Sequence, residues 1–233
     1  MLRFMILRPK SSRRHLVEPV GAEPFAPATP VPSWLRRALQ KPQTLEDAAM
    51  VAGAAIGALD AVVRRQERWA GAWRQRLALV AAAVTARTAG RVEDEGQLRD
   101  AVLLTRAGDD VGPAGRMLLA WRRLATRPAE QLLTLADVAQ VLEGLGLARD
   151  DEAVSDLVDD VRQLAASEEV VAVLGAAFAS AERHGVGGTM GAWLADVLLA
   201  QRLGWDHALP LLGTEQSLAA GAGRRRRASA GAA

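Results

Sequence analysis

The 233-residue sequence predicts an all-α protein: a single multi-helix domain, packed orthogonally or as a bundle, of eight or nine helices between disordered N- and C-terminal arms. Alanine (47 residues) and leucine (32 residues), the strongest helix formers, make up about a third of the chain. Tyrosine is absent and β-branched runs are few, although strands favour both residue types. The length is sufficient for a sizeable core, and the absence of cysteine excludes disulfides and a thiol nucleophile.

Helix signals follow one another through 33–212 with short breaks. We expect helices over 34–40, 45–65, 69–89, 93–106, 113–127, 132–142, 152–166, 168–184 and 190–203. Several have an N-cap residue in front of them (Ser33, Thr44, Ser167, Thr189), and Pro113 opens the fifth. Proline or glycine marks the expected ends (Pro42, Gly90, Pro128, Gly204).

The predicted helix over 45–65 carries apolar residues at helical spacing, and Gly53 and Gly57 leave a groove of small residues. Such a groove favours close packing against another helix. Asp60 stands four residues before Arg64, which is the favourable order for an ion pair on one helix face. We therefore expect a structural pair at Asp60 and Arg64.

The two ends of the chain differ from its middle. Six of the ten prolines lie in 1–32, so we expect a proline-rich, basic, extended arm there. Residues 33–212 show no internal linker and no repeat, which predicts one all-helical domain. Residues 213–233 form a low-complexity tail of arginine, alanine and glycine, which has little to bury.

The net charge of +2 and the pI near 9.8 describe the arms rather than the body. Residues 1–14 carry +5, and the tail adds +4 through a basic run (Arg224, Arg225, Arg226, Arg227). The remainder of the chain is −7. The arms could bind nucleic acid weakly and without sequence preference, in a manner that salt abolishes.

Residues 134–142, followed by Gly144 and Gly146, have the rhythm of a helix-turn-helix. Six carboxylates over 150–160 would repel DNA phosphates, so we do not expect DNA to be read there. Glu152, Asp156 and Asp160 share a helix face, but no calcium-binding loop accompanies them and we expect a solvated acidic face rather than a metal site. An alternative is that this face receives an arginine-rich arm, from the same chain or a neighbour.

No catalytic constellation is evident. The sequence contains no G-x-S-x-G, H-E-x-x-H or phosphate-binding loop motif, and its three histidines are scattered (His15, His184, His207). Adjacent Asp206 and His207 seldom orient one another, so we do not expect an acid–base pair there. We predict no catalytic, cofactor-binding or metal-binding residue.

Polar residues within apolar segments say more about the structure than the catalytic motifs do. Asp196 is surrounded in sequence by apolar residues of 193–199, and a carboxylate there requires a partner. We expect that partner to be Arg122, Arg123 or Arg202. Further candidates for structural or interaction roles are the turn and N-cap residues Asp109 and Asp110, together with Arg116 and Trp121.

Membrane insertion and secretion are not expected. The apolar run over 4–7 is too short for a signal peptide, and the longest uncharged apolar stretches, 48–59 and 170–181, are too short to span a bilayer. The sequence therefore predicts a soluble cytoplasmic protein.

Several segments resemble the DUF1403 family of alphaproteobacterial proteins of unknown function. They are WLRRAL (34–39), TLEDAA (44–49), WAGAWRQRLAL (69–79), GDDVGPAGR (108–116), LLAWRRLA (118–125), WLADVLLAQRLGW (193–205) and LPLL (209–212). The likeness covers about 33–212 and departs in both arms. It implies a helical bacterial protein, sometimes plasmid-associated, with no catalytic residues to carry over.

These observations favour a protein-interaction or self-associating module, with a protein partner or a second copy as ligand. The alternative is a plasmid-associated accessory protein that binds nucleic acid weakly through its basic arms, and an enzyme of unknown type ranks third. An exposed apolar patch favours the first, salt-dependent DNA retention the second, and a polar-lined pocket with perturbed titrating groups the third.

Overall fold

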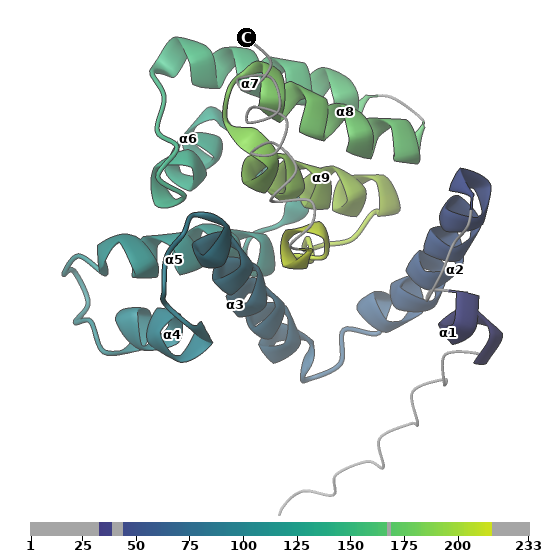
Figure 1. Cartoon of the computed structure of the whole chain (residues 1–233), viewed down its shortest axis with the longest axis horizontal. Helices are drawn as coiled ribbons and strands as arrows, with labels where there is room; N and C mark the ends of the chain where they lie inside the picture. Colours follow the sequence, from purple (N-terminus) through teal and green to yellow (C-terminus); the bar gives the residue numbers. More distant parts are fainter. Residues whose placement is uncertain (1–32, 39–43, 167–168, 216–233) are drawn as a thin grey trace, which may run out of the picture.

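Nine α-helices and two 3-10 turns make up the regular structure of residues 33–38, 44–166 and 169–215, which are the residues that the computed structural model describes (Figure 1). In chain order they are α1 (Ser33–Ala38), α2 (Leu45–Arg64), α3 (Ala70–Thr88), α4 (Glu95–Leu103), α5 (Gly112–Thr126), η1 (Ala129–Gln131), α6 (Leu135–Gly144), α7 (Asp151–Ala165), α8 (Val170–Arg183), α9 (Gly187–Leu203) and η2 (Leu212–Thr214). Within these ranges the only β pairing is an isolated bridge between Pro128 and His207. The predicted all-α class is confirmed.

Local capping chemistry sets several helix ends. The side chain of Thr44 accepts a hydrogen bond from the backbone N–H of Asp47 at 3.1 Å, as expected. Gly90 and Gly204 adopt positive φ values of 72° and 62° just beyond α3 and α9, where only glycine takes the left-handed conformation without strain. The expected cap Ser167 lies outside the described residues.

Four helices start two or three residues away from their predicted positions: α4, α6, α9 and α8, of which α8 begins at Val170. α4 begins two residues late because Asp94 and Gln97 form a reciprocal capping box. α6 begins at Leu135 because η1 occupies the preceding residues and Thr134 supplies the cap. α9 begins at Gly187, before the expected cap Thr189.

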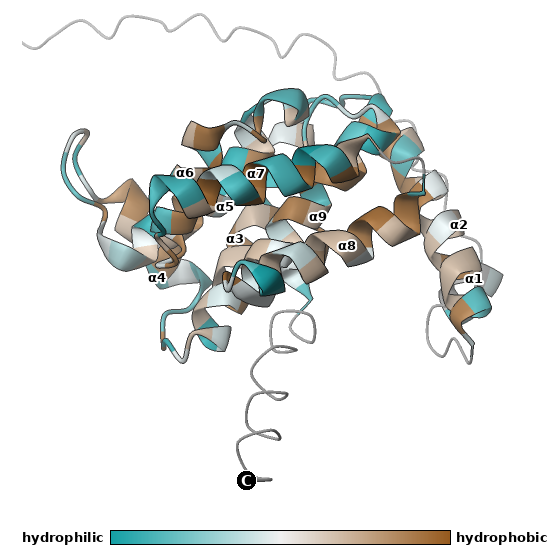
Figure 2. Ribbon diagram, turned by 90° about the horizontal axis from the view of Figure 1, so that it is seen from above, coloured by the Kyte–Doolittle hydropathy of each residue, from teal (hydrophilic) through white to brown (hydrophobic). Residues whose placement is uncertain are grey.

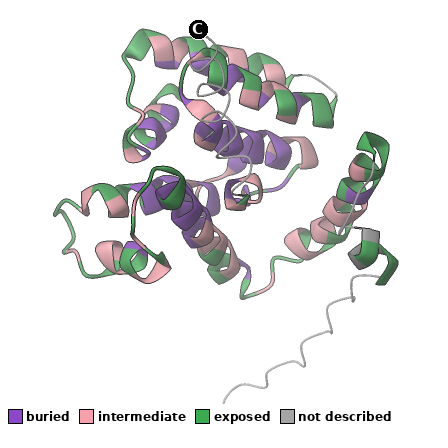
Figure 3. Cartoon of the chain, viewed as in Figure 1, coloured by how far each residue is buried: buried purple, intermediate pink, exposed green. Residues whose placement is uncertain are grey.

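α9 is the central helix of the fold. Its residues from Met190 to Ala200 are all buried, and α7, α8, η1 and η2 pack around it. Figure 3 shows this burial as a continuous purple helix. A helix that is apolar on every side requires such surroundings, because no face of it can be left to water.

α9 and the elements around it form one layer, and α3, α4 and α5 form a second. α6 connects the two, because it packs against both α5 and α7. Ala78, Ala81 and Ala82 of α3 are fully buried and allow α5 to approach closely. Trp121 of α5 and Trp193 of α9 are the largest fully buried side chains. In the part of the chain that is described, no helix is long and apolar enough to cross a membrane.

Candidate functional site

α1 and α2, here called the α1–α2 unit, lie at one side of the domain (Figure 1). Figure 2 shows α2 as a mostly white-to-brown, apolar helix. Yet Val51 is the only residue of α2 that is buried, whereas Leu45 is 78% exposed and Met50 69% exposed. Trp34 of α1 is 49% exposed. The unit therefore presents apolar side chains to solvent that an isolated domain has no reason to expose.

One end of α2 is attached to the body by a polar latch, formed by Asp60, Arg64, Trp205 and the carbonyl of Leu203. The Arg64 guanidinium contacts the Asp60 carboxylate at 2.8 Å, which confirms the predicted pair. The Trp205 indole N–H donates to Asp60 Oδ1 at 2.8 Å, and Arg64 Nη2 donates to the Leu203 oxygen at 2.6 Å. The hydrogen bonds from Arg64 and then from Trp205 lower the pKa of Asp60.

The connection between α2 and α3 contains a residue with an uncommon backbone conformation. Gln66 has φ of 45° and is the only non-glycine residue with positive φ in the described ranges. Its side-chain amide donates to the Asp206 carboxylate. A left-handed conformation costs a residue with a side chain roughly 1–2 kcal/mol. Trp69 and Trp73 follow, with ring centroids 5.8 Å apart in an edge-to-face arrangement.

We expect Asp60→Ala to speed amide hydrogen exchange along α2 while leaving exchange in α9 unchanged. The reason is that the substitution leaves the Trp205 indole N–H and the Arg64 guanidinium without their carboxylate. Mass spectrometry of deuterium uptake measures this. Asp100→Ala, which removes an exposed ion pair on α4, is the matched control. Equal uptake along α2 in Asp60→Ala and wild type would contradict a latch at this end.

Asp196 is 1% exposed and its partners differ from those expected. Its carboxylate accepts hydrogen bonds from the backbone N–H groups of Leu212 (2.9 Å) and Gly213 (3.2 Å), so it fastens η2 onto α9. The prediction of an arginine partner is wrong. Burial raises the pKa of Asp196 to about 8, against the lowering effect of these backbone donors.

Trp121 belongs to the same packed region. Its indole N–H donates to the hydroxyl of Thr85 on α3 at 2.9 Å. Its ring lies against Gly213, where an added Cβ would come within 2.2 Å of the ring. Gly213 therefore has to be glycine, and Trp121 and Asp196 both position the turn η2.

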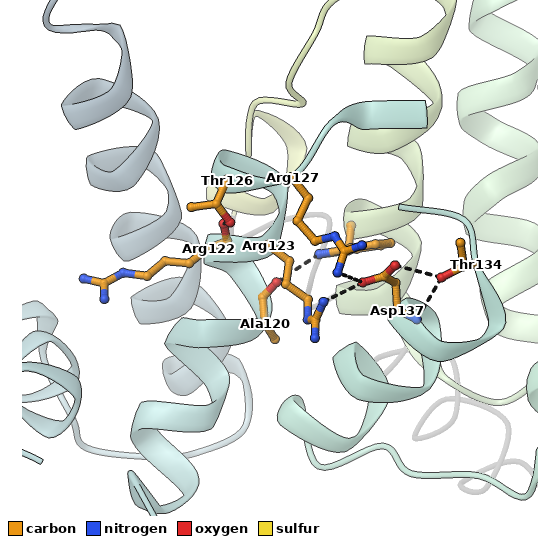
Figure 4. Close-up of polar contacts among 8 residues, drawn as sticks. Ala120, Arg122, Arg123, Thr126, Arg127, Thr134 and Asp137 are labelled. Atoms are coloured by element: carbon orange, nitrogen blue, oxygen red, sulfur yellow. Dashed lines mark hydrogen bonds and ion pairs between the residues drawn. The ribbon is translucent and has the colours of Figure 1, made fainter. Parts of the chain in front are cut away.

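The predicted partners of Asp196 lie elsewhere. Arg123 donates to Asp137 at 2.5 Å, and Arg127 also reaches Asp137, at 3.1 Å, while the Thr134 hydroxyl donates to the same carboxylate (Figure 4). This cluster joins α5 to α6. Arg122 points to the other side of α5 in Figure 4, and burial lowers its pKa. Within the described ranges the buried Nε atoms of Arg122 and Arg202 have no hydrogen-bond partner.

The loop before α5 is exposed. Asp110 accepts a hydrogen bond from the backbone N–H of Gly112 at 2.9 Å, as a turn residue does, but Val111 occupies the N-cap position of α5. The expectation of an aspartate N-cap there is wrong. Arg116 lies 3.9 Å from Asp110 and lines an open hollow of about 220 Å³ with Arg91 and Glu143. Arg224 to Arg227 lie outside the described residues.

A contact between α7 and α8 was not predicted. The Asp160 carboxylate lies 2.8 Å from His184 Nε2, 3.0 Å from Arg183 Nη2 and 3.4 Å from the Ser180 hydroxyl. Chiefly through the His184 hydrogen bond, the pKa of Asp160 is lowered. Serine and histidine each contact the aspartate instead of one another, so the cluster lacks the serine–histidine contact that would activate a nucleophile. It ties the two helices together.

The described residues give little support to a metal-binding or catalytic site. They contain no group of three or more histidine, aspartate or glutamate side chains placed to hold a metal ion. Asp206 and His207 line a small hollow with Gln66 and Trp73, and burial, followed by the charge of Arg74, lowers the pKa of His207. The strongly perturbed carboxyl, Asp196, lies in the core. The α1–α2 unit is therefore the best candidate for a functional surface.

Comparison with known proteins gives one match. A family model described as "Protein of unknown function (DUF1403)" matches residues 25–233. The match extends beyond the 33–212 expected from the sequence motifs and includes the arginine-rich tail. No curated protein and no solved structure matches the chain.

Proposed function

The chain belongs to the DUF1403 family, whose description assigns no activity, and from its surface we propose that it is an interaction module that binds another protein surface with the exposed face of α2. The proposal rests on the difference in burial between two similarly apolar helices, α9 and α2. α9 is buried by the domain itself, whereas α2 buries Val51 alone. Large exposed apolar surfaces on a folded domain are typical of binding sites.

The position of the charges on α2 supports the same function. No charged residue occurs between Asp47 and Asp60, so the middle of the helix has no polar group to keep hydrated. The latch holds the C-terminal end of α2 against the body and leaves the N-terminal half, with Leu45 and Met50, facing outward. A partner that covers this half removes apolar surface from water, which is favourable by roughly 25 cal/mol per Å² before the costs of association.

We expect the thiol of a Met50→Cys variant to be protected from maleimide in the cells that produce the chain. The chain has no cysteine, so the engineered thiol is its only one. Val92→Cys is the matched control, because Val92 is 91% exposed and lies far along the chain, before α4. A partner on α2 slows labelling of Met50→Cys relative to Val92→Cys. Equal labelling of the two thiols in cells would overturn the proposed function.

A further inference from the structure

We propose that the α1–α2 unit is a hinged arm with two states, attached to the body and released from it, and that the hinge is Gln66. In the attached state the hydrogen bond to Asp206 holds Gln66 in the left-handed conformation. In the released state Gln66 returns to an ordinary backbone conformation, and α2 swings away from the body with α1 packed against it. This motion is independent of what the exposed face of α2 binds.

The attachment of α2 to the body lies near one end of the helix. Among the described residues, Leu59 and Val63 are the residues of α2 that pack against the hydrophobic core, and Val51, although buried, is not part of that core. The helix extends about 20 Å beyond Leu59 toward Leu45 (Figure 1). A small rotation at the attached end therefore moves the other end over a long distance.

The polar contacts of this end all reach one short segment that follows α9. The latch joins α2 to Leu203 and Trp205, and the Gln66 amide donates to Asp206. The segment itself is fixed to the body, because the backbone N–H of Ala129 donates to the Asp206 carbonyl oxygen at 2.9 Å. A rotation at the connection breaks these neighbouring contacts together, which favours two discrete states over a continuous range of positions.

Gln66 occupies a position that other helices of this chain give to glycine. It is the second residue beyond the end of α2, and the second residue beyond α3, α6 and α8 is a glycine with positive φ (Gly90, Gly146, Gly185). Glycine takes this conformation without strain, whereas glutamine does not. Glycine, however, has no side chain to bond Asp206. The position thus combines backbone strain that favours release with a side-chain bond that favours attachment.

The distance between two spin labels on the purified full chain tests the hinge. Met50→Cys places one label on the arm and Gln140→Cys places the other on α6, and both positions are exposed in a chain without cysteine. We expect pulsed electron paramagnetic resonance to show a main, narrow distance distribution from the attached state and a minor second distribution from the released state. Dilution with unlabelled chain removes distances between copies.

Asp206→Ala removes the acceptor of the Gln66 amide and leaves the strain in place. We expect the released fraction to rise about fivefold, the factor that corresponds to one hydrogen bond. Glu130→Ala is the matched control, because this exposed carboxylate on η1 lines a hollow beside Asp206, and its removal should leave the fraction unchanged. Identical distance distributions in Asp206→Ala and wild type would overturn the proposal.

Adding Gln66→Gly to Asp206→Ala isolates the strain, because the bond between the two side chains is already lost. We expect the released fraction to fall about fivefold or more from its value in Asp206→Ala, since glycine adopts the left-handed conformation freely. A contact that served only to hold the two segments together would give no fall. A released fraction that stays constant or rises in the double variant would show that Gln66 is not the strained hinge.

The hinge and the proposed function fail separately. A single distance in every variant of the purified chain overturns the hinge and leaves the interaction function in place. Equal labelling of Met50→Cys and Val92→Cys in cells overturns the interaction function and leaves the hinge in place.

Discussion

Trp121→Ala is expected to lower the free energy of unfolding by about 3–5 kcal/mol, as for other large buried aromatic side chains. The ring is fully buried, and it joins three elements: α5, which carries it, α3 through the Thr85 hydroxyl, and η2 through Gly213. Its removal leaves a cavity and also leaves the Thr85 hydroxyl without its donor. Urea unfolding followed by circular dichroism gives the change, because that signal reports helix content and does not depend on the tryptophans.

Trp69→Ala is the matched control for this change. Trp69 is 37% exposed and lies at the N-cap position of α3, and its neighbour Trp73 remains in place. We expect this variant to lose less than Trp121→Ala, because more than a third of Trp69 is already in solvent and its removal leaves no enclosed cavity. A loss in Trp121→Ala no larger than that in Trp69→Ala would contradict the placement of Trp121 at the centre of the packing.

Asp196 is expected to make the protein less stable as the pH rises from about 4 to about 8. In the folded chain burial raises the pKa of Asp196 to about 8, whereas an unfolded aspartate ionises near 3.9. Between these values the folded state holds a proton that the unfolded state has released. Each increase in pH therefore favours the unfolded chain, and the stability lost in this window is fully present only below about pH 4.

Asp196→Asn isolates this effect, because asparagine does not titrate. At pH 5 the variant should be about as stable as wild type, because Asp196 is protonated there and its hydroxyl, like the amide N–H₂ of asparagine, is a donor that faces a backbone N–H. Toward pH 8 wild type should lose about 1.4 kcal/mol per pH unit while the variant does not, so the variant becomes the more stable of the two. Urea unfolding at several pH values measures both profiles, and Asp109→Asn, at an exposed position, should follow wild type. A gap that stays constant from pH 5 to pH 8 would refute the raised pKa of Asp196.

The helices and the contacts between close neighbours follow from the sequence. The Thr44 cap, the glycine ends at Gly90 and Gly204, and the Asp60–Arg64 pair each involve residues at most four positions apart. Such contacts depend on helical periodicity alone, so they follow once the helix is recognised.

The partner of Asp196 does not follow from the sequence, and the predicted arginine is wrong. The backbone donors of Leu212 and Gly213 lie beyond the end of α9, in a turn whose position over the helix no local pattern indicates. The Asp160–His184 contact joins two helices separated by 24 residues and had no sequence signal of its own. Residues that meet across elements become recognisable only when the packing of those elements is known.

By itself, the sequence determined that this protein is helical, where most helices lie, and that apolar residues dominate several of them. Only the tertiary structure decided that α9 is buried on every side while the similarly apolar α2 keeps most of its surface exposed. The physical reason is that burial depends on which elements surround a helix. For α2 these include the Trp205 indole, which donates to Asp60 from 145 residues further along the chain and holds the C-terminal end of α2, while Leu45 and Met50 in the N-terminal half stay exposed.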